Sequence, residues 1–465
     1  GKTAAMAFQY YHKRSKQPPA TMQLAELLGM LSYALDMTEG QPQGHCIRSC
    51  WIGTKLGMAM GMDERDLYDL YFTLLLKDLG CSSNAARICA LYLTDDISFK
   101  RDFKYIDGSL NAALRFVFAK TGLQAGLAER FRATVHILQN GGEISKSLME
   151  TRCQRGAEIA AKLRFGPAVQ DGIRALDEHW NGGGKPLGLK ETAIPMAANI
   201  ALLAQVVDIF HTAEGAPAAL REIESRSGTW FNPDLVAAFA ALSADGAFWR
   251  TLKRPDIDQI VFALPPGQKP TKVTEGYLDD ITAAFASVID AKSPFTADHS
   301  ARVTLYTDTI AEQLGLDQAH RRWLRRAALL HDLGKLAVSN QVLDKPSKLD
   351  DDEWQAIRAH SRHSEEILTR VSAFHDIAPI AGAHHERLDG HGYPYGLKGD
   401  QIGLEVRILT VADVFDALSA ERPYRAAIPI DEVFKIMERD IGTAFDATCI
   451  DALKRGMQAM NARAA

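Results

Sequence analysis

Cysteine is scarce in this 465-residue chain. The six are Cys46, Cys50, Cys81, Cys89, Cys153 and Cys449. No two of them form a CxxC pair, and their density is far below that of a small secreted domain held together by disulfides. A disulfide scaffold is therefore not expected. A reducing compartment fits this pattern best, and we predict a cytoplasmic protein.

The chain also lacks a strong net charge and a long uninterrupted apolar run. Its formal net charge of −5 gives no electrostatic reason to bind polymeric nucleic acid, so a small anionic substrate would need a local cationic site. The most apolar stretch, residues 191–210, contains Glu191, Asn199 and Asp208. These side chains would be costly in a membrane-spanning helix of roughly 20 residues. We predict a buried helix there, and no membrane partner.

Strand-like alternation of Val, Ile and Thr with polar residues is rare. Segments such as 70–79 (LYFTLLLKDL) and 321–333 (RRWLRRAALLHDL) are rich in Leu and Ala, with apolar residues three and four positions apart. This spacing places the apolar side chains on one face of a helix. We predict an all-α fold.

The chain repeats itself. Residues 200–210 (IALLAQVVDIF) match residues 408–418 (ILTVADVFDAL) at an offset of 208, and LLKDLGC at 75–81 matches LLHDLGK at 329–335 at an offset of 254. The difference between the offsets gives the first copy an insertion at about 82–151. A Pro-rich segment, LPPGQKPTK, lies between the copies. The sequence therefore predicts two tandem domains, 1–263 and 273–465, joined by a linker at 264–272.

The two copies differ where residues could carry chemistry. The second copy has His299, His331, Asp332, His360, His384, His385 and Asp413, where the first has His45, Lys77, Asp78, Arg152, Leu176, Asp177 and Gln205. Positions needed only for packing should be kept in both copies, so selective replacement here predicts that the seven residues form one site. Imidazole and carboxylate groups in this number suit one or two divalent transition ions, because a carboxylate can bridge two ions.

A single buried histidine is usually structural, so it is the joint pattern of the seven that predicts a metal site. If the helix predicted for residues 321–333 continues through the HD motif, His331 lies on its buried apolar face. Asp332 is then turned by about 100° from His331 around the helix axis. The other second-copy histidines have no such support and are predicted to be solvated or structural: His320, His363, His375 and His391. The arginine-rich segment 321–326 is interpreted as a solvated helix face.

These blocks resemble the HD superfamily of metal-dependent phosphohydrolases, and specifically its HD-GYP branch. HDLGK at 331–335 is similar to the motif that names the superfamily, and HHERLDGHGYP at 384–394 is similar to the signature of the branch. ADVFDAL at 412–418, followed by RPYR at 422–425, resembles the closing segment. The first copy resembles a degenerate HD domain.

The resemblance implies an all-helical fold and hydrolysis of a 3′,5′-cyclic dinucleotide, either cyclic di-GMP or 3′3′-cyclic GMP-AMP. The product would be the linear dinucleotide, with further cleavage to mononucleotides left open. Two divalent ions are implied, iron or manganese first and zinc or nickel as alternatives. A third ion is not expected, because Phe295 stands where some members have a glutamate ligand.

The family pattern also assigns roles to residues. The ligands would be the seven second-copy residues named above, with Asp332 bridging the two ions as a catalytic residue. Lys335, four residues after His331, is predicted to be catalytic and to reach a phosphate oxygen of the substrate; the alternative is an ordinary lysine at a helix end. The loop around Tyr393 would place its ring near a base or phosphate. For Arg422 and Arg425 the alternative is surface salt bridges, and the resemblance favours contact with the second phosphate.

Two other functions are consistent with these residues. One is a signalling adaptor that binds a cyclic dinucleotide without turnover. The other is a general HD phosphohydrolase that acts on nucleotides or monoesters, which the GYP segment disfavours. The amino-terminal copy is also a candidate surface for homodimer formation.

Overall fold

The computed structural model describes residues 23–39, 43–80, 146, 150–264, 266, 271–421 and 425–464, and these form helices joined by turns, with isolated bridges and no strand. This confirms the all-α prediction. The described residues divide into two compact units, one ending at Val273 and the other beginning at Thr274. Most of the predicted insertion lies outside the described residues, as do Cys81 and Arg422.

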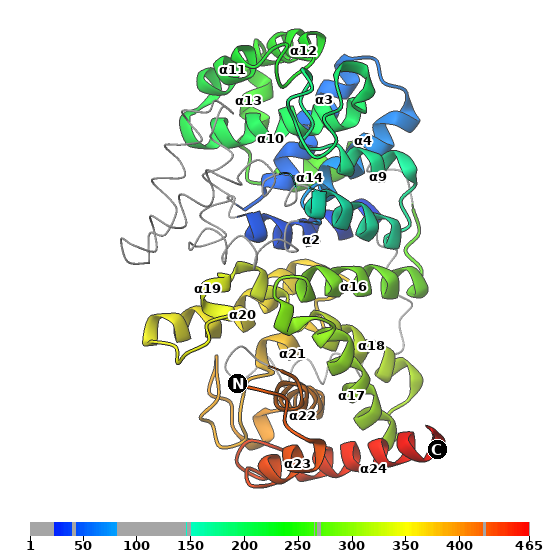
Figure 1. Ribbon diagram of the computed structural model, residues 1–465, viewed down its shortest axis with the longest axis vertical. Helices are drawn as coiled ribbons and strands as arrows, with labels where there is room; N and C mark the ends of the chain where they lie inside the picture. The colour runs from blue at the N-terminus through cyan, green and yellow to red at the C-terminus, as the bar shows by residue number, and fades with distance from the viewer. Residues whose placement is uncertain are drawn as a thin grey trace. The chain divides into compact units, whose positions relative to one another are not determined.

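The first unit is built around one apolar helix. Its helices are α2 (Leu24–Glu39), α3 (His45–Ala59), α4 (Glu64–Leu76), α9 (Pro167–Arg174), α10 (Met196–Glu214), α11 (Ala216–Ser225), α12 (Pro233–Ser243), α13 (Gly246–Leu252) and α14 (Ile257–Phe262), with a 3-10 turn, η2, at Glu191–Ala193; residues 150–162 are also helical. The helix α10 packs against α3 and α11 (Figure 1). By length and composition α10 could span a membrane, but 78% of its apolar window is buried inside the unit. It is the core helix that the sequence predicted.

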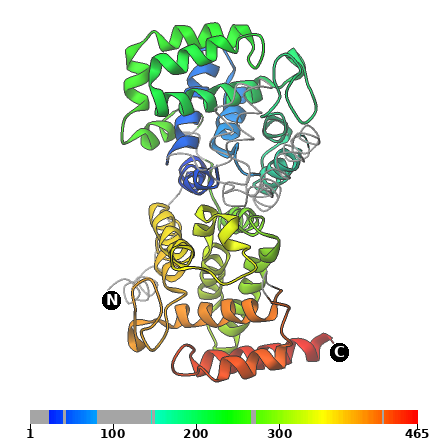
Figure 2. The same cartoon turned by 60° about the vertical axis from the view of Figure 1, so that its left-hand side comes forward.

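The second unit has the same construction. Its helices are α16 (Glu275–Asp290), α17 (His299–Gln313), α18 (Gln318–Leu330), α19 (Asn340–Leu343), α20 (Asp351–Arg370), α21 (Ala378–Ala383), α22 (Leu404–Ser419), α23 (Ile430–Glu438) and α24 (Ala447–Ala464), with 3-10 turns η3 (Pro294–Thr296), η4 (Leu333–Ala337) and η5 (Gly399–Gln401). The central helix α22 packs against α17, α21 and α24, and Figure 2 shows α24 alongside α22. Asp317 and Asp350 cap the amino termini of α18 and α20.

Matching contacts in the two units reproduce the offsets found in the sequence. Asp208 accepts from His45 Nδ1 at 2.7 Å and from Arg48 Nε at 2.7 Å, and Asp416 accepts from His299 Nδ1 at 2.6 Å and from Arg302 Nε at 2.7 Å. The two units therefore share a polar frame as well as a helical one.

A second matched pair shapes the glycine-rich loops. Glu386 accepts from the backbone N–H groups of Tyr395 (2.6 Å) and Leu397 (2.9 Å). Glu178 accepts from Leu187 and Leu189 at the same two distances. Each loop also contains a cis peptide bond before proline, at Pro186 and Pro394. The loop is thus a retained structural element.

The interpretation of residues 321–326 as a solvated face is wrong for Arg326, which is buried. All four arginines are also ion-paired to neighbouring helices. Arg321 and Arg325 donate to Asp308 of α17, and Arg322 and Arg326 donate to Asp279 of α16. The sequence could not reveal these pairs, because both aspartates lie on other elements.

Candidate metal centre

Five segments of the second unit supply the seven predicted ligands. His299 begins α17, His360 lies in α20, and Asp413 lies in α22. His331 and His384 are the C-terminal cap residues of α18 and α21. The helix α18 ends at Leu330; His331, its cap, keeps right-handed helical backbone angles, and Asp332 caps the 3-10 turn η4. Both side chains belong to the same group of ligand atoms.

The first group of ligand atoms, which we call the acidic lobe, surrounds one oxygen of Asp332. It consists of Asp332 Oδ2 with His299, His331 and Asp413. Asp332 Oδ2 lies 3.3 Å from His299 Nε2 and 3.2 Å from His331 Nε2. Asp413 Oδ1 lies 3.1 Å and 3.3 Å from the same two nitrogens. The four side chains are buried.

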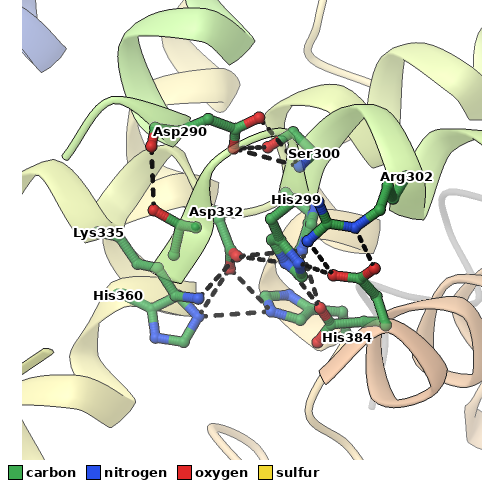
Figure 3. Close-up of polar contacts among 12 residues, drawn as sticks. Asp290, His299, Ser300, Arg302, Asp332, Lys335, His360 and His384 are labelled. Carbon is green, nitrogen blue, oxygen red and sulfur yellow. Dashed lines mark hydrogen bonds and ion pairs between the residues drawn. The ribbon is translucent and has the colours of Figure 1, made fainter. Parts of the chain in front are cut away.

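The second group, the histidine lobe, consists of His360, His384 and His385, and it faces the other oxygen of Asp332. Asp332 Oδ1 lies 3.2 Å from His360 Nε2 and 3.5 Å from His384 Nε2. The two imidazole nitrogens are 3.4 Å apart. In Figure 3, dashed lines run from the Asp332 carboxylate to His299, His360 and His384. A single carboxylate therefore joins the two lobes.

The protein fixes the orientation of the imidazole rings. His331 Nδ1 donates to Ala328 O at 2.6 Å, His384 Nδ1 donates to Ala381 O at 2.5 Å, and His360 Nδ1 donates to Ile357 O. When Nδ1 carries the proton in this way, Nε2 presents a lone pair, as metal-ligating histidines require. Each of these rings therefore has its lone pair facing the lobe.

The spacing of the ligand atoms fits metal ions. Nitrogen and oxygen ligands about 2.1 Å from an ion lie about 3.0–3.4 Å from one another in octahedral or tetrahedral geometry. The separations in both lobes, 3.1–3.5 Å, agree with this. His299 Nε2 and Asp332 Oδ1 are buried and have no hydrogen-bond partner among the described residues. Unsatisfied buried polar atoms are rare, and here both point into a lobe.

The electrostatics of the lobes differ. Burial lowers the pKa of His299, but the neighbouring carboxylates of Asp332, Asp413 and Asp416 outweigh burial and raise the pKa to about 9. In the same way, the carboxylates of Asp332 and Asp413 outweigh burial and raise the pKa of His331. Burial and the neighbouring imidazoles instead hold the pKa of His385 well below its usual range. Without an ion, the acidic lobe therefore attracts protons that a divalent ion would displace, while His385 stays neutral.

Three structural residues around the site were not predicted. Asp416 positions His299, Arg302 in turn pairs with Asp416, and Glu386 holds the loop after His385. The sequence contained a signal for them: Asp416 and Glu386 have the same residue types at the aligned first-copy positions 208 and 178. That retention indicates a role in the frame common to both copies.

The predicted substrate residues lie at different distances from the cluster. Lys335 Nζ donates to Asp332 Oδ2 at 2.8 Å. The Tyr393 ring stacks on His385, with ring centroids 4.8 Å apart, and the Arg358 guanidinium lies 5.2 Å from the centroid of the Tyr393 ring. The guanidinium of Arg425 donates to the carbonyl oxygens of Ala417, Leu418 and Ala426.

The histidines that were set aside lie away from the cluster. His391 is exposed, and His363 is partly exposed beside Glu366. His320 pairs with Glu405, and His375 donates to Thr369 O. The structure agrees with their predicted solvated or structural roles. The position of Phe295 within η3 likewise adds no carboxylate to the site.

Comparisons with known proteins bear on this site. The HD domain family matches residues 283–449. The chain is 54% identical over 437 residues to the 3′3′-cGAMP-specific phosphodiesterase 3 of Vibrio cholerae, covering 94% of this chain and 95% of that protein. The chain belongs to the HD-GYP branch of the HD superfamily.

Two further similar proteins are also named as cyclic dinucleotide phosphodiesterases. The cyclic di-GMP phosphodiesterase response regulator RpfG of Xanthomonas campestris is 43% identical over 173 residues, 37% of this chain and 46% of that protein. The crystal structure of a cyclic GMP-AMP-specific phosphodiesterase from V. cholerae, V-cGAP3, has a TM-score of 0.65 at 48% identity. The comparison covers 94% of this chain and 98% of that one. HD-domain phosphohydrolases are metal-dependent, as the lobes described above lead one to expect.

Proposed function

We propose that this protein hydrolyses a 3′,5′-cyclic dinucleotide to its linear form at the two lobes of the second unit. The observation that carries the proposal is the position of Asp332, which offers one oxygen to each of two sets of buried ligands. A phosphodiester resists attack because its anionic oxygens repel nucleophiles. When bound, two divalent ions would neutralise that charge and lower the pKa of a water molecule that attacks phosphorus.

The residues of the chain would divide the work as follows. Asp332 and Asp413 would hold the ions together with the five histidines. The Lys335 ammonium, which is partly exposed beside Asp332, would donate to a nonbridging phosphate oxygen. Tyr393 would form one wall of the substrate pocket from its position on His385.

The second phosphate of the substrate is assigned to Arg422 and Arg425. Arg422 lies outside the described residues, so its assignment depends on the resemblance of RPYR to the family motif. The Arg425 guanidinium donates to the carbonyl oxygens of Ala417 and Leu418 in α22. It would therefore act mainly by anchoring the chain that follows α22, to which Arg422 belongs.

The proposed ions are iron or manganese, with zinc and nickel as alternatives. Imidazole and carboxylate ligands suit all four, and neither lobe contains a thiolate that would favour zinc. Metal analysis of anaerobically purified protein, with activity restored by each ion added to metal-free protein, tests this choice.

The first candidate substrate is 3′3′-cyclic GMP-AMP, because the relative that matches over nearly the full length is named for it. Cyclic di-GMP is the second candidate, because a relative that matches 37% of this chain is named for it. Metal-loaded protein should be incubated with each cyclic dinucleotide and the products identified by mass spectrometry. A linear dinucleotide that is absent with the His331→Ala and Asp332→Ala variants supports the proposal.

The same experiment separates the alternatives. Tight binding without product would indicate an adaptor. Hydrolysis of nucleotide monoesters in preference to cyclic dinucleotides would indicate a general phosphohydrolase. Sedimentation of the full chain, compared with a chain that begins at residue 273, tests whether the amino-terminal half forms a homodimer.

A further inference from the structure

The first unit keeps the frame of the metal centre without its ligand set. His45 Nδ1 has the same hydrogen bond to an aspartate as His299 Nδ1. Among the described residues, both clusters of three or more metal-ligating side chains lie in the second unit. What fills the corresponding place in the first unit is visible in its contacts.

The ammonium of Lys77 lies among the counterparts of the acidic lobe. Lys77 Nζ donates to His45 Nε2 at 2.9 Å, to Asp78 Oδ2 at 2.7 Å and to Gln205 Oε1 at 3.1 Å. These three acceptors align with His299, Asp332 and Asp413. The Lys77 side chain is fully buried. An ammonium has three N–H donors, and here they point at atoms equivalent to metal ligands.

The guanidinium of Arg152 lies among the counterparts of the histidine lobe. Arg152 Nη2 donates to Asp78 Oδ1 at 3.3 Å, and its Nη1 lies 3.7 Å from Asp177 Oδ2. Asp78 therefore offers one oxygen to Lys77 and the other to Arg152. Asp332 divides its two oxygens between the lobes in the same way.

We propose that Lys77 and Arg152 are covalently attached replacements for the two metal ions, so that the first unit binds no transition metal. Each cation stands where an ion would be held and satisfies the carboxylate that would bridge the pair. A divalent ion would have to enter against the positive charge of Lys77 and displace its hydrogen bonds. The first unit thus keeps its interior neutralised independently of the metal supply.

The first test measures zinc in a full chain whose second unit is disabled. The variant carries His331→Ala, Asp332→Ala, His360→Ala and His384→Ala, and it is dialysed against Zn²⁺ and then against buffer. We expect less than about 0.2 zinc ions per chain. Retention of about one ion or more, lost when His45→Ala is added, would overturn the proposal.

The second test restores the ligand set in an otherwise wild-type chain. The substitution Lys77→His places a second imidazole beside His45, Asp78 and Gln205. The resulting set matches the acidic lobe except that Gln205 stands in place of an aspartate. We expect this variant to bind about one zinc ion per chain more than wild type, and its thermal unfolding to shift upward when zinc is added. Zinc is counted by elemental analysis.

The matched control is Lys162→His, which adds a histidine at an exposed position of the same unit. It should gain no bound zinc. A folded Lys77→His variant, checked by circular dichroism, that binds no more zinc than this control would overturn the proposal. If Lys77→His does not fold, the zinc content of the disabled chain decides alone.

Discussion

Replacing Asp416 by Asn should weaken metal binding without removing a ligand. Asp416 accepts from His299 Nδ1 at 2.6 Å, and it is held by Arg302 at 2.7 Å. Its carboxylate keeps His299 in the tautomer and orientation that present Nε2 to the acidic lobe. Loss of such a partner typically lowers metal affinity by about 10–100-fold, which equals about 1.4–2.8 kcal/mol.

The chain provides a matched control for this experiment. Asp208→Asn removes the carboxylate that accepts from His45 Nδ1 and Arg48 Nε, each at 2.7 Å. These contacts match those of Asp416, but they lie in the first unit, where no ion is predicted. Both variants should lose a similar free energy of unfolding, about 1.5–3 kcal/mol, because each weakens hydrogen bonds to a buried charge. Their metal binding should differ.

The assay is a competition titration of metal-free protein with zinc and a chromophoric chelator, followed by the rate of cyclic dinucleotide hydrolysis at subsaturating metal. Asp416→Asn should show the weaker zinc binding, and added metal should recover most of its rate. Asp208→Asn should match wild type in both. Equal zinc affinities for Asp416→Asn and wild type would refute the positioning role of Asp416.

Lys335→Met should retain the metal content of wild type but lower kcat by about 10²–10³-fold, because the variant loses a charged donor to a phosphate oxygen. An unchanged kcat would mean that Lys335 does not contact the phosphate. Glu386→Gln and Glu178→Gln should each lower the free energy of unfolding, measured in urea, by about 1–3 kcal/mol, because an amide cannot accept from both loop N–H groups. Only Glu386→Gln should also reduce the rate of hydrolysis. Burial lowers the pKa of His179 to about 4, so the folded state disfavours the protonated imidazole. The free energy of unfolding of the first unit should therefore fall as pH drops from about 6.5 to 4, by at most about 3 kcal/mol before solvent screening. Thermal unfolding at pH 5 and 7 should show a smaller pH dependence for His179→Phe than for wild type.

The sequence alone predicted the helical class and the group of seven residues. Periodicity revealed the helices, because apolar faces repeat locally. The ligand set was visible for a different reason: a duplicated chain shows which positions changed when chemistry was lost. The structure brings all seven into two adjacent lobes, and their occupation by metal stays a prediction.

Other features depended on contacts that the sequence does not contain. The paired arginines of 321–326 find aspartates on α16 and α17, and Asp416 reaches a histidine 117 residues away. The end of α18 at Leu330 was also missed, because apolar periodicity continues into the HD motif although the helix does not. Local patterns carry no information about such long-range partners, and they do not distinguish an α-helix from the 3-10 turn that follows it.

The shared carboxylate of Asp332 has a consequence for how the centre fills. An ion in one lobe would fix the orientation of that carboxylate and draw charge from it, and both effects reach the second oxygen. The occupancies of the two lobes would therefore be coupled through Asp332 and not independent of each other.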